Sequence, residues 1–292
     1  MLHVYRISIH YQSNMKLSVI VVNNNAGALL QQALNSLISA CKNIDYELII
    51  VDNTLTEHAT DALQSQFPHA LFITNTTYQG IAKANNEAIN QANGEYILVV
   101  STDTICGKDS LQKACSFMDE HPDSGGLSVR MLNPEGRFLP ESIHGLDRYW
   151  AGFLKFIGFA RHLSKTRLYN RNRKDWVEEF QISEIDILSS DFMLLRKSVL
   201  NEIGLFDERF LMYGHNIDLS YRIRLAGYKN YYFPKTYIIN YERQQLPKFS
   251  WNYIKYFYGA MIIFAVKYLI RVPQIKVDGI PALFQHSYEV KG

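Results

Sequence analysis

The sequence has few cysteines, little net charge and no long apolar run. Its three cysteines, Cys41, Cys106 and Cys115, form no C-x-x-C pair and cannot all be matched in disulfides. That pattern favours a reducing, cytoplasmic compartment over secretion. The formal net charge is only +2, so no global field indicates a nucleic-acid partner.

Two further absences narrow the class of protein. The apolar run at 256–266 lies between Lys255 and Lys267 and is shorter than the ~20 residues that a membrane span needs. Residues 1–15 lack the apolar core of a signal peptide, and we expect them to form an N-terminal extension. No G-x-G-x-x-G follows the first apolar segment, which argues against nicotinamide and flavin proteins and against a methyltransferase.

The first half of the chain alternates segments typical of strands and helices. Continuous apolar runs predict strands at 17–22, 47–51, 71–73 and 96–100. Helical spacing predicts a helix that carries Leu30, Leu34, Leu37 and Ile38, and another at 81–92 before Gly94. This rhythm predicts an α/β fold, a Rossmann-like and mostly parallel sheet flanked by helices, with ligands at the carboxyl ends of the strands.

The second half is less regular. We expect variable loops with some helix at 133–180, a strand at 187–195, helices at 197–203 and 217–226, and extended segments at 231–233 and 237–241. The aromatic segment 250–270 predicts a helix that packs on the domain, with an interfacial membrane helix as the alternative.

Acidic side chains follow two of the predicted strands. Asp52 ends IIVD and Asp103 lies in the turn STDT after 96–100. An isolated aspartate there would often be only a helix cap. Two of them in one βαβ array favour ligand binding, with Asp52 suited to a nucleobase and Asp103 to a divalent cation on a diphosphate.

Several segments together resemble one enzyme family. They are LSVIVVNNN, ELIIVDNT, YQGIAKANNEAINQANGEYILVV, STDT, MLLRKSVLNEIGLFDERFLMYG and IDLSYRIRLAGYKNYYFP, in that order. Their order and spacing resemble a family 2 glycosyltransferase of the GT-A fold, in its rhamnosyltransferase-like branch. The resemblance implies a GT-A domain at 16–245, with a nucleotide-binding half at 16–131 and an acceptor half at 132–245, and a helical tail at 246–292.

The resemblance also implies a function and a site. The function would be transfer of a sugar, with inversion, from a nucleotide-sugar donor to a saccharide or lipid-linked acceptor in cell-surface polysaccharide synthesis. Asp103 would bind Mg²⁺ or Mn²⁺, and position 216 would be the general base. The nucleotide would be bound by Val22, Asn23, Asn24, Asp52, Lys83, Ser101 and Thr102.

This sequence departs from the family pattern at the chemistry-bearing positions. His215 and Asn216 stand where the family has an acidic pair. The metal turn keeps only one acid, because Ser101-Thr102-Asp103 stands where the branch often has Asn-Pro-Asp. Asn240 replaces a frequent histidine, and Arg243-Gln244-Gln245 replaces a Gly-Glu-Ser-like stretch. Asp191 occupies a place that usually holds a small residue.

These departures leave two hypotheses open. In the first, the enzyme is active and its base is His215, whose reference pKa of ~6.5 suits that role, or Asp191 or Asp218. Asp218 could instead pair with Arg222 one helical turn later. In the second, the protein binds a nucleotide sugar or a partner enzyme without turnover, because Asn216 cannot accept a proton.

A cluster of basic residues without acids lies between Arg161 and Lys174. It is either a solvated loop or a site for anionic lipid head groups or a phosphate-bearing acceptor. Together with 250–271, it predicts peripheral contact with the inner face of the cell membrane.

Overall fold

The structure is a computed structural model that describes residues 15–24, 27–54, 61–144, 179–241 and 251–269. The basic segment 161–174 and the Arg243-Gln244-Gln245 stretch lie outside these ranges, so the expectations for them stay predictions.

The first half forms a parallel sheet with the strand order β3-β2-β1-β4. The chain runs through β1 (Leu17–Asn23), α1 (Gly27–Ala40), β2 (Tyr46–Asp52), α2 (Asp61–Gln66), β3 (Leu71–Thr74), α3 (Ile81–Gln91) and β4 (Tyr96–Val100). The four predicted strands are confirmed, because buried β-branched runs of this kind suit the interior of a parallel sheet.

The second half extends this sheet beyond β4 in the order β8-β6-β9-β5, with β7 also paired to β9. Its elements are β5 (Thr104–Cys106), α4 (Ser110–Glu120), β6 (Ser124–Leu132), α5 (Glu141–His144), β7 (Ser183–Ile185), β8 (Phe192–Arg196), α8 (Lys197–Ile203), α9 (His215–Leu225), β9 (Lys229–Asn240) and α10 (Trp251–Leu269). β8 is antiparallel to both β4 and β6, whereas β6 and β9 are parallel. The predicted α/β fold with a C-terminal helix is confirmed.

Two predicted strand boundaries were wrong. The strand expected at 187–195 begins only at Phe192, because the residues before it bond to side chains instead of a neighbouring strand. Ser189 N–H donates to Ser128 Oγ at 3.0 Å, and Asp191 N–H donates to Ser189 Oγ at 3.3 Å. The segments expected at 231–233 and 237–241 belong to one strand, β9, whose register against β6 shifts between Val129 and Arg130. Pro234 lies at that irregularity, where its missing N–H costs no ladder bond.

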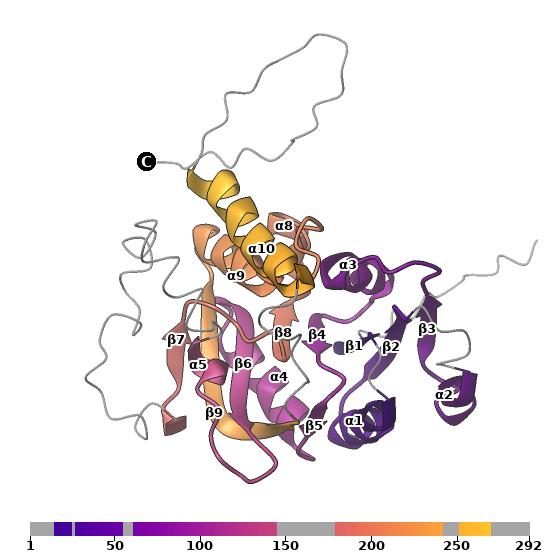
Figure 1. The fold of residues 1–292 in the computed structure, drawn as a ribbon. Helices are drawn as coiled ribbons and strands as arrows, with labels where there is room; N and C mark the ends of the chain where they lie inside the picture. Colours follow the sequence, from indigo (N-terminus) through magenta and orange to yellow (C-terminus); the bar gives the residue numbers. More distant parts are fainter. Residues whose placement is uncertain (1–14, 25–26, 55–60, 145–178, 242–250, 270–292) are drawn as a thin grey trace, which may run out of the picture.

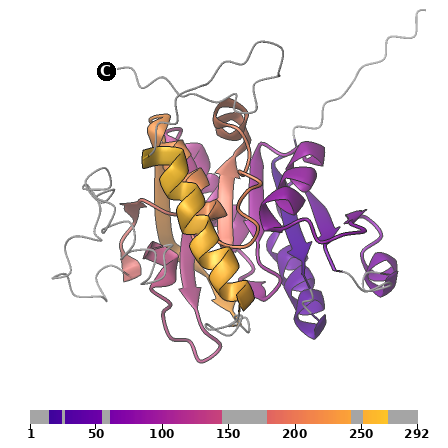
Figure 2. The same ribbon diagram turned by 45° about the horizontal axis from the view of Figure 1, so that its top comes forward.

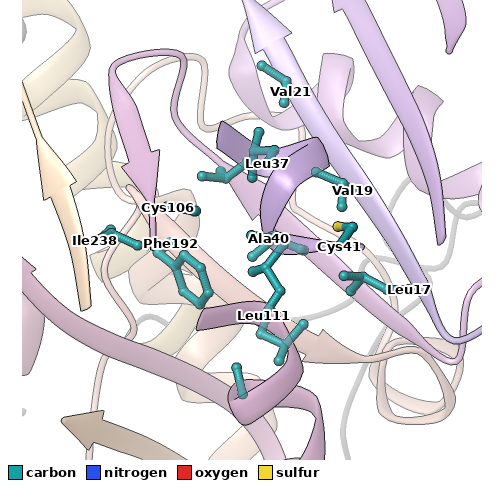
Figure 3. Close-up of a cluster of buried hydrophobic side chains, with 14 of the residues drawn as sticks. Leu17, Val19, Val21, Leu37, Ala40, Cys41, Cys106, Leu111, Phe192 and Ile238 are labelled. Carbon is teal, nitrogen blue, oxygen red and sulfur yellow. The ribbon is translucent and has the colours of Figure 1, made fainter. Parts of the chain in front are cut away.

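Helices cover both faces of the sheet (Figure 1). One apolar cluster joins the sheet to α1 and α4 through residues such as Leu37, Leu111 and Phe192 (Figure 3). A second cluster on the other face joins it to α3, α8 and α9 through Ala84, Val199 and Leu219. Cys41, Cys106 and Cys115 are all buried and free.

Helix α10 packs outside the second face, across α9 (Figure 2). Tyr253, Phe257 and Phe264 of α10 are buried together with Phe210 and Ile217. This confirms that the tail helix packs on the domain. Of the described helices, none has the length and apolar character needed to cross a membrane.

Candidate functional site

The candidate site lies where the connections of the sheet change direction. β1 is followed by β2 on one side, while β4 pairs on its other side. In open α/β sheets such a switch point leaves a crevice at the carboxyl ends of the strands. Asn23, Asp52 and Ser101 come from the carboxyl ends of β1, β2 and β4, so the topology brings these predicted nucleotide-binding positions to one edge of the sheet.

Asp52 is held by its neighbours at the end of β2. Its Oδ1 accepts bonds from Thr54 N–H at 3.1 Å, Thr54 Oγ1 at 2.8 Å and Asn23 Nδ2 at 3.4 Å. The side chain is only 4% exposed. These three donors all bond to Oδ1, and a carboxylate oxygen of this kind can accept from an N–H donor on a ligand.

Side-chain amides extend the hydrogen-bond network beyond Asp52. Of these, Asn24 was predicted from the sequence, whereas Asn53 and Asn75 were missed. Asn53 Nδ2 donates to Asn24 Oδ1 at 2.8 Å, and Asn53 Oδ1 accepts from Asn75 Nδ2 at 3.4 Å and Gln79 N–H at 3.2 Å. Asn53 and Asn75 are both buried. The signal available in the sequence was an asparagine directly after two successive strands. The network links the ends of β1, β2 and β3 into one polar rim.

The turn after β4 holds the predicted cation ligand. Asp103 is 6% exposed, and its Oδ1 accepts a short hydrogen bond from Ser101 Oγ. Thr102, between them, is buried. The end of β9 lies beside this turn, because Tyr241 N–H donates to Asp103 O at 3.0 Å. Asn240, where the resemblance would place a histidine, therefore lies opposite Thr104 in the β5–β9 ladder.

Asp191 lies directly opposite Ser101 of this turn, just before the neighbouring strand β8. Ser101 N–H donates to Asp191 O at 3.1 Å, which continues the β4–β8 ladder by one residue beyond Val100 and Phe192. The Asp191 side chain is half-buried, and its Oδ2 accepts from Ser189 Oγ at 3.4 Å. Of the acids considered for catalysis, Asp191 is the one whose backbone bonds to the turn that holds Asp103.

Helix α9 begins at the residues that replace the family's acidic pair. Gly214 precedes it with φ 85°, a left-handed conformation that suits glycine. His215 is 4% exposed and packs edge-on against Phe206, with ring centroids 5.6 Å apart. Burial lowers the pKa of His215 to about 4, below the reference value of ~6.5 that suits a general base. Within the described chain, His215 Nδ1 has no hydrogen-bond partner.

Asn216 and Asp218 take structural contacts. Asn216 Nδ2 donates to Leu188 O at 2.9 Å, which ties α9 to the segment that precedes Asp191. Asp218 is fully buried and accepts from Arg222 Nε at 2.9 Å, Lys267 Nζ at 2.6 Å and Tyr268 Oη at 2.6 Å. The alternative of a pair with Arg222 is thus the one that the structure shows. With three donors on its carboxylate, Asp218 is a poor candidate for a base.

The segment before α9 contacts the start of α3. Ile81 N–H donates to Leu211 O at 2.8 Å. Gly80 adopts φ 81°, and a Cβ there would approach the Leu211 side chain to 2.9 Å. Lys83, in the first turn of α3, is exposed. The segment around Leu211 therefore packs against the first residues of α3.

The donor atoms at Asp103 fit a hard divalent cation. They are carboxylate and hydroxyl oxygens, which Mg²⁺ and Mn²⁺ prefer. Across the described ranges, no group of three or more His, Cys, Asp or Glu side chains converges as a metal site. This is compatible with a cation that takes one or two carboxylates from the protein and its other ligands from substrate phosphates.

Comparisons with known proteins agree with this geometry. The family described as glycosyl transferase family 2 matches residues 18–204. The N-acetylglucosaminyl-diphospho-decaprenol L-rhamnosyltransferase of Mycobacterium tuberculosis is 23% identical over 238 residues, covering 77% of this chain and 76% of that protein. The Staphylococcus aureus TarS fragment solved with UDP-GlcNAc superposes with a TM-score of 0.60 at 21% identity, covering 87% of this chain and 66% of that one.

A mannosyltransferase from Pyrobaculum calidifontis, solved with GDP-Man and Mn²⁺, superposes with a TM-score of 0.55 at 18% identity, over 79% of this chain and 58% of that one. The chain thus spans less than two thirds of these two crystallised chains. At such identities the superpositions show the fold alone.

The sheet order, the strand-end acids and these neighbours define a GT-A glycosyltransferase fold. The chain belongs to glycosyl transferase family 2. Its resemblance to rhamnosyltransferases is also confirmed by the mycobacterial relative.

Proposed function

We propose that this protein transfers a sugar, with inversion, from a nucleotide-sugar donor to a hydroxyl of a saccharide or lipid-linked acceptor in cell-surface polysaccharide synthesis. The observation that carries the proposal is the position of Asp52 at the end of β2 and of Asp103 just after β4, strands on either side of β1 at the switch point of a family 2 GT-A fold. One acid suits a nucleobase and the other a diphosphate-bound cation, which are the two ends of a nucleotide-sugar donor.

The donor would lie across the carboxyl ends of β1, β2 and β4. Val22, Asn23, Asn24 and Asp52 would surround the base and ribose. Lys83, Ser101 and Thr102 would lie along the diphosphate, where Lys83 contributes a positive charge. Structural neighbours crystallised with UDP-GlcNAc and with GDP-Man support a donor of this class.

Asp103 would hold Mg²⁺ or Mn²⁺ at the diphosphate. When bound, such a cation would neutralise charge that develops on the leaving group. The Mn²⁺ reported with the Pyrobaculum mannosyltransferase supports this choice of ion. Ser101 orients the Asp103 carboxylate through its hydroxyl.

The transfer itself exchanges one bond at the anomeric carbon for another. The acceptor oxygen bonds to this carbon as the bond to the diphosphate oxygen breaks, and the electron pair leaves with the nucleoside diphosphate. The hydroxyl proton must pass to a protein group. Asn216 cannot accept it and Asp218 is occupied by three donors, which leaves neutral His215 and Asp191.

A second candidate function is binding of a nucleotide sugar, or of a partner enzyme, without turnover. Asn216 favours it, because the family's base position holds an amide that is already bonded to Leu188 O. Loss of a positioned base typically costs about 10²–10⁴-fold in rate. Nucleotide binding without consumption of any donor would identify this alternative.

The proposal is tested by nucleoside diphosphate release from a panel of uridine, thymidine and guanosine diphosphate sugars with Mg²⁺ or Mn²⁺. We expect one donor to be consumed, and we expect Asp103→Asn to lower the rate by about 100-fold or more. Asp109→Asn is the matched control, because Asp109 is an exposed acid that pairs with Lys113 on α4. If no nucleoside diphosphate binds with or without metal, both candidate functions are excluded.

Peripheral membrane contact at the inner face of the cell membrane is the remaining part of the proposal. Helix α10 supports it, because Trp251 is 78%, Tyr258 50% and Ile262 64% exposed on its outer face. The helix has no acid, and its Lys255 is exposed, whereas Lys267 pairs with Asp207 and Asp218. Such a face suits an anionic lipid surface, where a lipid-linked acceptor would be presented.

A further inference from the structure

The antiparallel pairing of β4 and β8 places Asp191 beside the cation-binding turn. Val100 pairs with Phe192, and the next bond runs from Ser101 N–H to Asp191 O at 3.1 Å. Residues directly opposite each other in an antiparallel ladder carry their side chains on the same face, with Cβ atoms about 4.5–5.5 Å apart. The Asp191 carboxyl group and the Ser101 hydroxyl therefore rise from one face of the sheet.

The Ser101 hydroxyl is also the group that binds Asp103. It donates to Oδ1 of Asp103, two residues further along the chain. Asp191 is the residue opposite Ser101 on the neighbouring strand. The face is the one covered by α3, α8 and α9, because Met193, two residues from Asp191, is buried in that cluster. At the end of β4 the Ser101 hydroxyl thus bonds to the Asp103 carboxylate. It shares a face of the sheet with the Asp191 carboxylate, which accepts from Ser189 Oγ at 3.4 Å.

We propose that Asp191 supplies the second carboxylate of the cation site, in place of an acid at position 101. The proposal rests on the proposed function, in which a cation binds the donor diphosphate. Mg²⁺ in such sites uses one or two carboxylates besides phosphate oxygens. A serine at position 101 offers only a neutral oxygen. Asp191, opposite it on the neighbouring strand, supplies a negative charge from the same face of the sheet.

The geometry favours this role for Asp191 over that of proton acceptor. The direct neighbour of Asp191 is Ser101 of the cation-binding turn. Helix α9, at whose start the family places its base, reaches this segment at Leu188, whose carbonyl accepts from Asn216 Nδ2 and whose N–H donates to Ser220 Oγ. The geometry therefore places Asp191 on the diphosphate side of the site.

Cation affinity, measured without turnover, tests the assignment. Mn²⁺ binding is followed by electron paramagnetic resonance in the presence of saturating UDP, dTDP or GDP. Asp191→Asn should raise the Kd for Mn²⁺ by about 10-fold or more, as loss of a ligand or of its support does. Asp103→Asn should do the same, and the exposed Asp109→Asn should leave the Kd unchanged.

An exchange of the acid across the ladder makes the test sharper. Ser101→Asp combined with Asp191→Asn returns a carboxylate to the site from the opposite strand, so the Kd should return to the wild-type value. Asp191→Glu, which keeps the charge, guards against a failure of Asp191→Asn to fold, and it should bind Mn²⁺ more tightly than Asp191→Asn or Asp191→Ser. Circular dichroism identifies variants that are not folded.

The outcomes separate this inference from the proposed function. Wild-type Mn²⁺ affinity in Asp191→Asn, with lost affinity in Asp103→Asn, would overturn the inference and leave the function intact. The inference is also overturned if Asp191→Asn abolishes transfer at unchanged affinity, since Asp191 would then be the proton acceptor, or if the exchange variant binds no better than Asp191→Asn. A wild-type protein that binds no Mn²⁺ with any of the three nucleotides would overturn both.

Discussion

At the scale of single residues, the side-chain amide of Asn216 holds α9 to the segment before β8. Its Nδ2 group donates to Leu188 O at 2.9 Å in a buried setting. A carboxylate at this place could not donate and would face a carbonyl oxygen. Asn216→Asp would thus introduce a possible base but remove the hydrogen bond to Leu188 O. Asn216 therefore has a structural role of its own.

His215 gives the first residue-scale prediction. Burial lowers its pKa to about 4, whereas an unfolded histidine titrates near ~6.5. A depressed pKa means that the unfolded state binds a proton first, so stability is complete above pH ~6.5 and falls as the pH drops toward 4. We expect His215 to account for up to about 3 kcal/mol of that loss.

Urea unfolding of the wild type and of His215→Gln at pH 7 and pH 4.5 measures this effect. The variant lacks the titrating group, so its stability should change less between the two pH values. For the same reason, an active enzyme should show no inflection near pH 6.5 that arises from this residue. An NMR titration that places the His215 pKa at 6 or above would refute the buried, neutral state.

At the scale of elements, a buried ionic network joins α9 to α10. Asp218 accepts from Arg222, Lys267 and Tyr268, and Lys267 also bonds Asp207 at 2.8 Å. Arg222 in turn donates to the carbonyls of Ile203, Gly204 and Leu205. The network therefore fixes α10 and the end of α8 relative to the helix that borders the site.

Removal of the central charge should destabilise the whole domain. Asp218→Asn leaves buried Arg222 without its acidic partner and Lys267 with Asp207 alone, and we expect a loss of about 3–5 kcal/mol in the free energy of unfolding. The matched control is Asp123→Asn, which breaks an exposed pair with Lys229 and should cost less than about 1 kcal/mol. Equal losses in the two variants, measured by urea denaturation, would contradict the structural role of Asp218.

Element prediction from the sequence succeeded where local signals were strong. β4 and α8 have the predicted bounds. β4 is a continuous apolar run, and α8 ends just before Gly204, which has φ 82°. β6 was missed because Gly125 and Gly126 weaken its pattern. Those glycines are needed by packing, since a Cβ on Gly126 would approach Leu188 to 2.4 Å. Helix α4 was missed although its apolar spacing was present.

Prediction of the site had a different limit. Asp52 and Asp103 could be placed, because the carboxyl ends of neighbouring parallel strands meet at one edge. The pairing of Ser101 with Asp191 could not, since it depends on an antiparallel contact between strands far apart in the sequence. The burial that shifts the pKa of His215 likewise comes from Phe206 and the surrounding fold rather than from the residue's own segment.

At the scale of the whole molecule, α10 is apolar on two sides. Its inner side, with Phe257 and Phe264, completes the domain. Its outer side leaves Trp251, Tyr258 and Ile262 in solvent. Packing on α9 explains the inner apolar face of the helix but not the outer one. The division into a GT-A domain at 16–245 and a tail at 246–292 stays a prediction, although α10 shares a core with α9.

The outer face of α10 gives the whole-molecule prediction. Trp251→Ser combined with Ile262→Ser should weaken binding to phosphatidylglycerol-containing vesicles by about 10-fold or more, because two large side chains no longer enter the interface. Leu71→Ser, at an exposed apolar position on β3, is the matched control and should bind as the wild type does. Co-sedimentation measures both, and added salt should weaken binding if the lysines contribute. The prediction fails if the double variant binds like the wild type, or if the wild type binds neither these vesicles nor phosphatidylcholine vesicles.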